Sequence, residues 1–397
     1  MIIAHYQQFE LKPISYAFAM GEFMSSDCMA TTDIQESFER YRASFTKRSE
    51  GFILPNVKYL GKFSKNIEEI MEEDFFISMP IKNQESIITN VLTTLLKTTD
   101  NSISIGLIFD NCSDRSLELC LDFFENNFKL YPNLVAVHFV VSDGELFEST
   151  AENILFLLCN QKYFVSLQSD IYFTDKTFLN RASKAFALIP ELFAVSGKAI
   201  VTFNIMSKFK KYLNRVFHFH NSILRFLPNY KAVKKTGYYL PFLGYFGDLS
   251  NPPESNMHYS SNQMNKIYLG EAVIRGPIVW LSKTFRGLNG FDDVGFVLGR
   301  DDCDLSFRGF LNGHISSYLP STAYSIYEQG TTRKSRSIED RIALKARQEL
   351  SQNFPGRLVN FWNKRSSDKA FEKKAINQMK IEVKNAYGSS INLSDMS

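Results

Sequence analysis

Short apolar runs alternate with helix-length segments through the middle of the chain. Five of the runs are rich in β-branched and aromatic residues, which predicts strands at 75–80, 102–110, 134–142, 163–170 and 193–203. The segments between them predict helices near 84–97, 114–128, 147–160 and 176–188. Because crossovers between parallel strands are right-handed, this order predicts an α/β fold, with a mainly parallel sheet covered by helices on both faces.

The flanking segments are less regular than this core. Residues 1–72 mix short apolar pieces with turn residues and show no clear period, so we treat them as an N-terminal extension of unknown role. The α/β domain is expected to span 73–330. Residues 331–397 are polar and helical in pattern, which predicts a C-terminal helical extension with a frayed tail.

Composition narrows the class of protein. A chain of 397 residues with 44% hydrophobic content can bury a large core. The 45 basic and 42 acidic residues nearly balance, so no overall field favours a nucleic-acid or membrane partner. The five cysteines form no C-x-x-C pair, and no apolar stretch reaches the roughly 18 residues of a membrane span. We therefore expect a cytoplasmic protein, at most peripheral to a membrane.

Polar and acidic residues follow the ends of three predicted strands, at 80–85, 110–116 and 168–170. In an open parallel sheet, the carboxyl ends of the strands and the following helix N-termini form a crevice with exposed backbone donors. Any one of these acids alone is better explained as a helix cap or a turn residue. Their recurrence at several strand ends of one sheet favours a nucleotide-diphosphate site.

The order and spacing of these segments resemble the family 2 glycosyltransferases with the GT-A fold. The resemblance rests on a P-x-x-N-x-E-like opening at Pro80, a D-N-x-S-D-x-S turn from Asp110, and an acidic motif after the fourth strand. Most specific are a G-F-D turn within 275–293 and an acidic helix start within 298–314. The resemblance implies an enzyme that transfers a sugar from a nucleotide diphosphate to a glycan or lipid-linked acceptor, with inversion.

On the donor side, the resemblance implies a set of nucleotide-sugar-binding residues at the strand ends. Asp110 falls where the family binds the base and ribose. For Asp114, the alternative to nucleotide-sugar binding is that it caps the next helix. The full set is Pro80, Lys82, Glu85, Asp110, Asp114 and Asp170.

The resemblance also implies a divalent metal cofactor, Mn²⁺ or Mg²⁺. Asp170 matches the last acid of the family's D-x-D motif, and a hard cation that bridges the phosphates prefers such oxygen ligands. Gln168 replaces the first acid of this motif. Many relatives carry a metal-binding histidine in the region that corresponds to 325–335, and Glu328 is a weaker candidate ligand there; the alternative for Glu328 is an exposed strand-end residue.

On the acceptor side, the resemblance aligns Asp301 and Asp302 with the family's E-D pair and implies that Asp302 is the general base. A carboxylate suits this role because the acceptor hydroxyl loses its proton only as the new bond forms. The alternative is that acids at a helix start are favourable for structural reasons alone. Arg308 is expected to fix this helix, and Trp280 either stacks on a sugar or is a buried strand residue.

The segment 204–247 separates the donor half (73–203) from the acceptor half (248–330). It contains lysines, arginines and many aromatic residues but no acidic residue. This composition suits capture of an anionic acceptor or contact with an anionic membrane surface. A helical hairpin with packed aromatics and solvated lysines is the alternative.

Two other functions compete with sugar transfer. A catalytically weakened scaffold that binds sugar nucleotides in glycan assembly would explain Gln168 and the missing histidine. A sugar-phosphate nucleotidyltransferase should have a glycine-rich loop after its first strand, and 79–83 offers none.

Overall fold

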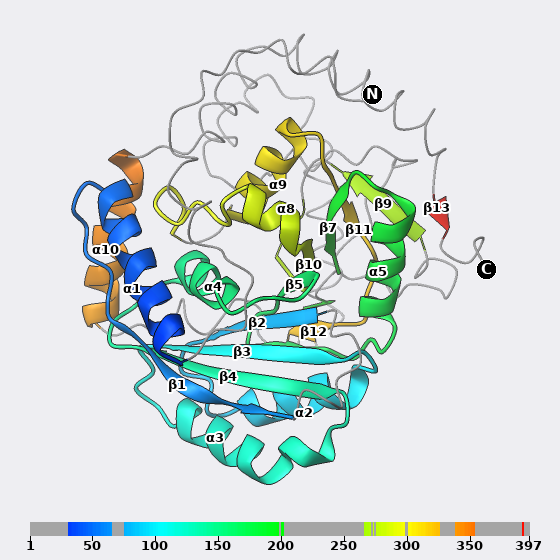
Figure 1. The fold of residues 1–397 in the computed structure, drawn as a ribbon, viewed down its shortest axis with the longest axis horizontal. Helices are drawn as coiled ribbons and strands as arrows, with labels where there is room; N and C mark the ends of the chain where they lie inside the picture. Colours follow the sequence, from blue (N-terminus) through cyan, green and yellow to red (C-terminus); the bar gives the residue numbers. More distant parts are fainter. Residues whose placement is uncertain are drawn as a thin grey trace, which may run out of the picture.

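The computed structural model describes residues 31–65, 75–197, 200–201, 266–270, 273, 275–297, 301–325, 338–353 and 391–392. These residues form a mainly parallel sheet with helices on both faces (Figure 1). The predicted α/β fold class is confirmed.

The sheet has ten strands in the order β1-β4-β3-β2-β5-β10-β7-β11-β9-β13. Their bounds are β1 (Val57–Ser64), β2 (Phe75–Ile81), β3 (Ile103–Asp110), β4 (Leu134–Ser142), β5 (Tyr163–Ser166), β7 (Leu192–Ser196), β9 (Lys266–Gly270), β10 (Ile278–Leu281), β11 (Ile315–Tyr318) and β13 (Ile391–Asn392). A second sheet contains β6 (Ile171–Tyr172), β8 (Ile200–Val201) and β12 (Tyr324–Ser325).

The described helices connect and cover these strands. They are α1 (Thr31–Arg48), α2 (Ile88–Thr98), α3 (Ser116–Asn127), α4 (Glu148–Phe156), α5 (Phe178–Leu188), α8 (Ser282–Gly287), α9 (Asp301–Leu311) and α10 (Ile338–Asn353), with a short 3₁₀ turn at Phe128–Leu130. None of the described helices is both long and apolar enough to cross a membrane.

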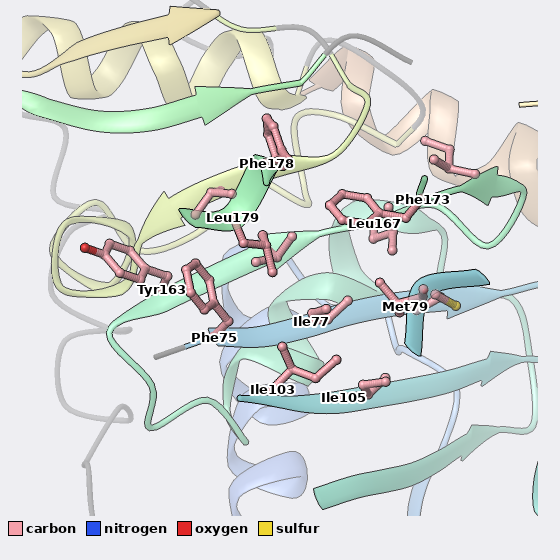
Figure 2. Packing of buried hydrophobic residues seen from close by; sticks show 14 of the residues in the cluster. Phe75, Ile77, Met79, Ile103, Ile105, Tyr163, Leu167, Phe173, Phe178 and Leu179 are labelled. Carbon is pink, nitrogen blue, oxygen red and sulfur yellow. The ribbon is translucent and has the colours of Figure 1, made fainter. Parts of the chain in front are cut away.

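Alternating side chains of the central strands enter two separate cores. Ile77 and Met79 of β2 pack with Ile105 of β3 in the core beneath α2, α3 and α5 (Figure 2). Phe76 and Ile108, on the opposite face of the same strands, pack with α1 and α4. A parallel sheet covered on both faces favours apolar residues at consecutive positions, which is why these strands appear as nearly continuous hydrophobic runs.

The antiparallel strand β10 departs from the expected parallel order. β4, β3, β2 and β5 pair in parallel, but β10 lies between β5 and β7 and is antiparallel to both. A four-residue apolar strand carries no periodic signal of its direction, so the sequence pattern did not reveal this insertion. Its consequence is that β10, within residues 275–297, lies inside the sheet between β5 and β7.

The N-terminal and C-terminal segments also pack on the domain. β1 pairs antiparallel with β4 at the edge of the sheet, and α1 contributes Phe38 and Phe45 to the core. α10 lies beside α1, with the Arg347 guanidinium 4.6 Å from the centre of the Phe45 ring (Figure 1). Residues from before and after the expected domain therefore stabilise it.

Candidate functional site

Asp110, at the end of β3, fixes the entry to α4. Its Oδ1 accepts the backbone N–H of Leu146 at 2.6 Å, and its Oδ2 accepts that of Phe147 at 3.1 Å. Burial raises the pKa of Asp110, while these bonds and the charge of Lys82 act in the opposite direction. Phe147 has a φ of 68°. Asp110 thus holds the left-handed residue directly before α4, and its binding to a base and ribose stays a prediction.

Lys82, after β2, is engaged within the protein. Its Nζ donates to the carbonyl oxygen of Asn111 at 2.9 Å and forms an ion pair with Asp340 of α10 at 3.2 Å. Pro80 is partly exposed and lies opposite Ile108 in the β2–β3 register. The ion pair between Lys82 and Asp340 means that α10 reaches the loop that follows β2.

Glu85 and Asp114 brace the loops after β2 and β3 against each other. Asp114 accepts the backbone N–H of Glu85 at 2.9 Å and that of Ser116 at 3.0 Å, while Glu85 accepts the N–H of Arg115 at 3.1 Å. Because Ser116 is the first residue of α3, Asp114 satisfies a helix-start donor, as the capping alternative predicts.

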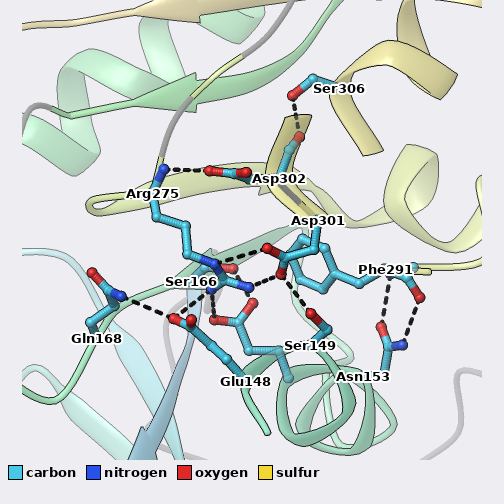
Figure 3. A network of polar contacts seen from close by, with 12 residues as sticks. Glu148, Ser149, Asn153, Ser166, Gln168, Arg275, Phe291, Asp301, Asp302 and Ser306 are labelled. Carbon is cyan, nitrogen blue, oxygen red and sulfur yellow. Dashed lines mark hydrogen bonds and ion pairs between the residues drawn. The ribbon is translucent and has the colours of Figure 1, made fainter. Parts of the chain in front are cut away.

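A cluster of charged side chains joins α4, α9 and the segment before β10 (Figure 3). The Arg275 guanidinium forms ion pairs with Glu148 at 2.8 Å, with Glu152 at 2.9 Å and with Asp301. Asp301 has no exposed surface and also accepts the Ser149 hydroxyl at 2.7 Å. We refer to Arg275, Glu148, Glu152 and Asp301 as the Arg275 cluster.

The Arg275 cluster is strongly perturbed electrostatically. Burial alone would lower the pKa of Arg275, but the charges of Asp301, Glu148 and Glu152 raise it well above its ordinary value. Burial raises the pKa of Glu152 to about 7, against the opposing charge of Arg275, and it also raises the pKa of Glu148. Perturbed carboxylates of this kind concentrate at functional sites.

The predicted base Asp302 lies at the start of α9, beside this cluster. Its Oδ2 accepts the backbone N–H of Arg275 at 2.5 Å, and its carbonyl oxygen accepts the Ser306 hydroxyl at 2.7 Å (Figure 3). Only 4% of Asp302 is exposed. One residue, Arg275, thus contacts both acids of the expected pair: its guanidinium binds Asp301 and its backbone N–H binds Asp302.

Sequence reasoning missed Arg275, Glu148 and Glu152. Glu148 and Glu152 are four apart and share one face of α4, where acids are ordinarily solvated. The available signal was that the rest of α4 carries no charge and ends in an apolar run, so acids on a buried helix needed a buried partner.

Trp280 lies in the core, as its structural alternative predicts. It has no exposed surface and packs against Phe193, Phe285 and Phe291. Its Nε1 donates to the Ser166 hydroxyl at 3.0 Å. A side chain without exposed surface offers no face to a sugar, so the stacking role is not supported.

Arg308 fixes α9, as expected from its position. Its guanidinium donates to the carbonyl oxygens of Leu288 and Gly290 and to Asp304, the last at 2.8 Å. Burial raises the pKa of Asp304 to about 6 despite the charge of Arg308. These contacts attach α9 to the turn after α8.

Asp293, directly after the G-F-D turn, anchors α1 and α10 to the domain. Its carboxylate accepts Arg48 at 2.8 Å and the Tyr41 hydroxyl, and its carbonyl oxygen accepts Arg347 at 2.7 Å. Neighbouring Phe291 is held by Asn153 of α4 through both backbone groups, each at 2.9 Å. The turn thus connects both terminal helices to α4.

Gln168 and Asp170 follow β5 at the same edge. Gln168 donates its amide to Glu148 Oε1 at 3.1 Å, and Asp170 accepts the Ser325 hydroxyl at 3.0 Å. A carboxylate at position 168 would face Glu148 as a like charge, which gives the departure at Gln168 a local reason. Burial raises the pKa of Asp170.

The described residues do not complete a metal site. Among them, no group of three or more His, Cys, Asp or Glu side chains is arranged to hold a metal ion. Asp170 is described, whereas Glu328 and the basic segment 204–247 lie outside the described residues.

The Gln168–Glu148 contact makes a testable prediction about charge. Gln168→Glu should lower the unfolding free energy by roughly 1.5–3 kcal/mol, because it removes a hydrogen bond to a charged group and adds a like charge. Glu148→Gln restores a donor opposite an acceptor but also removes the ion pair of Glu148 with Arg275, so it serves as the second background. Gln168→Glu should cost much less on the Glu148→Gln background than in the wild type. Chemical denaturation of both single variants and the double variant measures this, and an equal cost of Gln168→Glu on the two backgrounds would contradict the pairing.

No family model matches the chain, and no curated protein matches it. Among solved structures, the chain is similar to S. aureus TarS 1–349 in complex with UDP-GlcNAc, at 14% identity and a TM-score of 0.41, over 67% of this chain and 62% of that one. It is also similar to a mannosyltransferase from Pyrobaculum calidifontis in complex with GDP-Man and Mn²⁺, at 11% identity and a TM-score of 0.41, over 90% and 98%.

The match to this chain covers 60% of the length of the protein in another structure of TarS 1–349. It covers 37% of the length in a structure described only as S. aureus TarS. At these identities and TM-scores, similarity does not define a family or an activity for this chain.

Proposed function

We propose that this chain is an inverting glycosyltransferase that uses a nucleotide-diphosphate sugar, with Asp302 as general base. The observation that carries the proposal is that the Arg275 cluster joins Asp301 and Asp302 on α9 to Glu148 and, through it, to Gln168 after β5 (Figure 3). This contact links residues that we assign to the donor side and to the acceptor side and that are far apart in the sequence, which supports the proposal.

The proposed chemistry is a single displacement. Asp302 accepts the proton of an acceptor hydroxyl while that oxygen bonds to the anomeric carbon, and the nucleoside diphosphate leaves from the opposite face with the bonding electrons. The acceptor is proposed to be a glycan or a lipid-linked glycan.

A panel of nucleotide sugars tests the proposal directly. A donor that binds only the folded protein raises its thermal stability by mass action. The donor that protects should then be turned over with an acceptor, and the product should have the anomeric configuration opposite to that of the donor. Protection by no nucleotide sugar, or a product of retained configuration, would overturn the proposal.

A second candidate is a scaffold that binds sugar nucleotides without transferring them. Gln168 favours it, as do Lys82 and Asp110, whose polar groups bond within the protein. Donor protection without any turnover would select this candidate.

Asp170 is the residue at which we propose that a divalent cation contacts the protein. Asp170→Asn should abolish the Mn²⁺-dependent part of nucleoside-diphosphate binding, because a neutral amide is a weaker ligand for a hard cation. Calorimetric titration with and without Mn²⁺ measures this. Asp175→Asn is the matched control, since Asp175 is a buried acid paired with Arg181 and should keep the binding. Unchanged affinity in the Asp170 variant would remove it from the site.

A further inference from the structure

Arg275 contacts the proposed base and α4 with different parts of one residue. Its backbone N–H holds Oδ2 of Asp302 at 2.5 Å, and its guanidinium holds Glu148 and Glu152 of α4 together with Asp301 of α9 (Figure 3). The Arg275 side chain is only 11% exposed. The contacts of the guanidinium therefore restrain the residue whose backbone N–H fixes the base.

We propose that Arg275 is a positioning residue for Asp302 and that Glu152 anchors it to the sheet. This inference rests on the proposed function, because it assigns Arg275 to the orientation of the group that removes the acceptor proton.

The anchor runs through buried contacts into the central strands. Glu152 has no exposed surface; its Oε1 accepts Arg275 at 2.9 Å, and its Oε2 accepts the Ser166 hydroxyl at 2.7 Å. Ser166 ends β5 and also accepts Trp280 Nε1–H from β10 at 3.0 Å. The position of Arg275 is therefore set by two neighbouring strands of the core.

Only a guanidinium matches this arrangement of partners. Nη1 of Arg275 faces Glu148 and Glu152, while Nε and Nη2 face Asp301. A planar fork of donors spans carboxylates on two helices, whereas a lysine ammonium is a point charge that cannot hold all of them. Arg275→Lys thus keeps the charge but loosens the link between α4 and α9.

The test compares Arg275→Lys and Glu152→Gln with the wild type. We expect kcat to fall in both, by up to about 10²-fold in Arg275→Lys, because small misplacements of a catalytic group have effects of that size. Donor protection and the acceptor KM should stay close to wild type, since neither variant changes a proposed binding residue. Asp175→Asn is the control, because its buried ion pair with Arg181 at 2.6 Å lies outside the Arg275 cluster.

A purely structural role would lower activity only through the folded fraction, as in Asp175→Asn. Unchanged kcat per folded molecule in Arg275→Lys and Glu152→Gln would overturn the inference. Should Arg275→Lys fail to fold, Glu152→Gln decides, since it keeps shape and size. If the wild type is active, Asp302→Asn inactivates it, and Arg275→Lys and Glu152→Gln keep full turnover, then only the positioning role is rejected. A wild type that transfers from no donor rejects the proposed function, and the inference falls with it.

Discussion

Asp302→Asn should reduce sugar transfer by about 10² to 10⁴, the range expected when a positioned general base is removed. Asparagine keeps nearly the same shape, and its side-chain oxygen can still accept the backbone N–H of Arg275 that Asp302 accepts at 2.5 Å. The amide has almost no basicity, so it cannot accept the proton of the acceptor hydroxyl. Donor binding should survive, which the thermal protection assay measures on the same sample.

The structural alternative for Asp302 predicts a different result. If Asp302 only stabilises the start of α9, asparagine does so nearly as well and activity should hardly change. Asp304→Asn is the matched control, because Asp304 lies in the same first turn, is 1% exposed and pairs with Arg308 at 2.8 Å. The control should lose stability but keep its turnover per folded molecule. Near-normal transfer by the Asp302 variant would remove it from the catalytic role.

Asp293→Asn should give the largest loss of stability, about 3–5 kcal/mol, as expected when a buried ion pair loses one partner. Asp293 is fully buried, and Arg48, at 2.8 Å from it, is 13% exposed. The same carboxylate accepts the Tyr41 hydroxyl, so the substitution weakens two attachments of α1 together. Chemical denaturation at neutral pH measures the loss.

The contribution of Asp293 should also depend on pH. Burial opposes its ionisation, but the charge of Arg48 and the bond from Tyr41 hold the net pKa of Asp293 below its ordinary value. A lowered folded-state pKa stabilises the protein above the unfolded value of about 4, and this stabilisation is lost as the pH falls through the folded value. In Asp293→Asn, this pH-dependent contribution to the unfolding free energy should vanish. The exposed pair Arg115–Glu118 supplies the control, and Glu118→Gln should leave the denaturation midpoint unchanged. An equally small effect of Asp293→Asn would contradict the anchoring role.

The helices and strands of the core were largely predictable because the burial pattern of each element leaves a trace in its sequence. Residues 103–110 are buried at every position and mostly apolar, since both faces of that strand are covered. An acidic helix start within 298–314 was also expected, from the family resemblance, and α9 begins at Asp301.

The partners of buried polar groups were not predictable, because periodicity reports burial and not proximity. Glu152 is four residues after Glu148 on α4, yet its partner Arg275 lies more than a hundred residues further along the chain. The polar atoms of Asp110 likewise bond to backbone groups that only the folded loop brings near. Composition could suggest a stacking role for Trp280, but only the packing of β10 shows that the ring is enclosed.

The insertion of β10 between β5 and β7 makes the two halves of the domain inseparable as folding units. A fragment that ends before residue 204 would contain β5 and β7 but not the strand that hydrogen-bonds to both. Each would then present an open edge with unpaired backbone groups, which favours pairing with other chains. The pairing of β10 with β5 and β7 joins residues that are distant in sequence, so it requires the closure of long loops, which costs entropy. The core therefore forms fully only after β10 has paired with both strands. The donor binding and sugar transfer that we propose would therefore depend on a single cooperative structure.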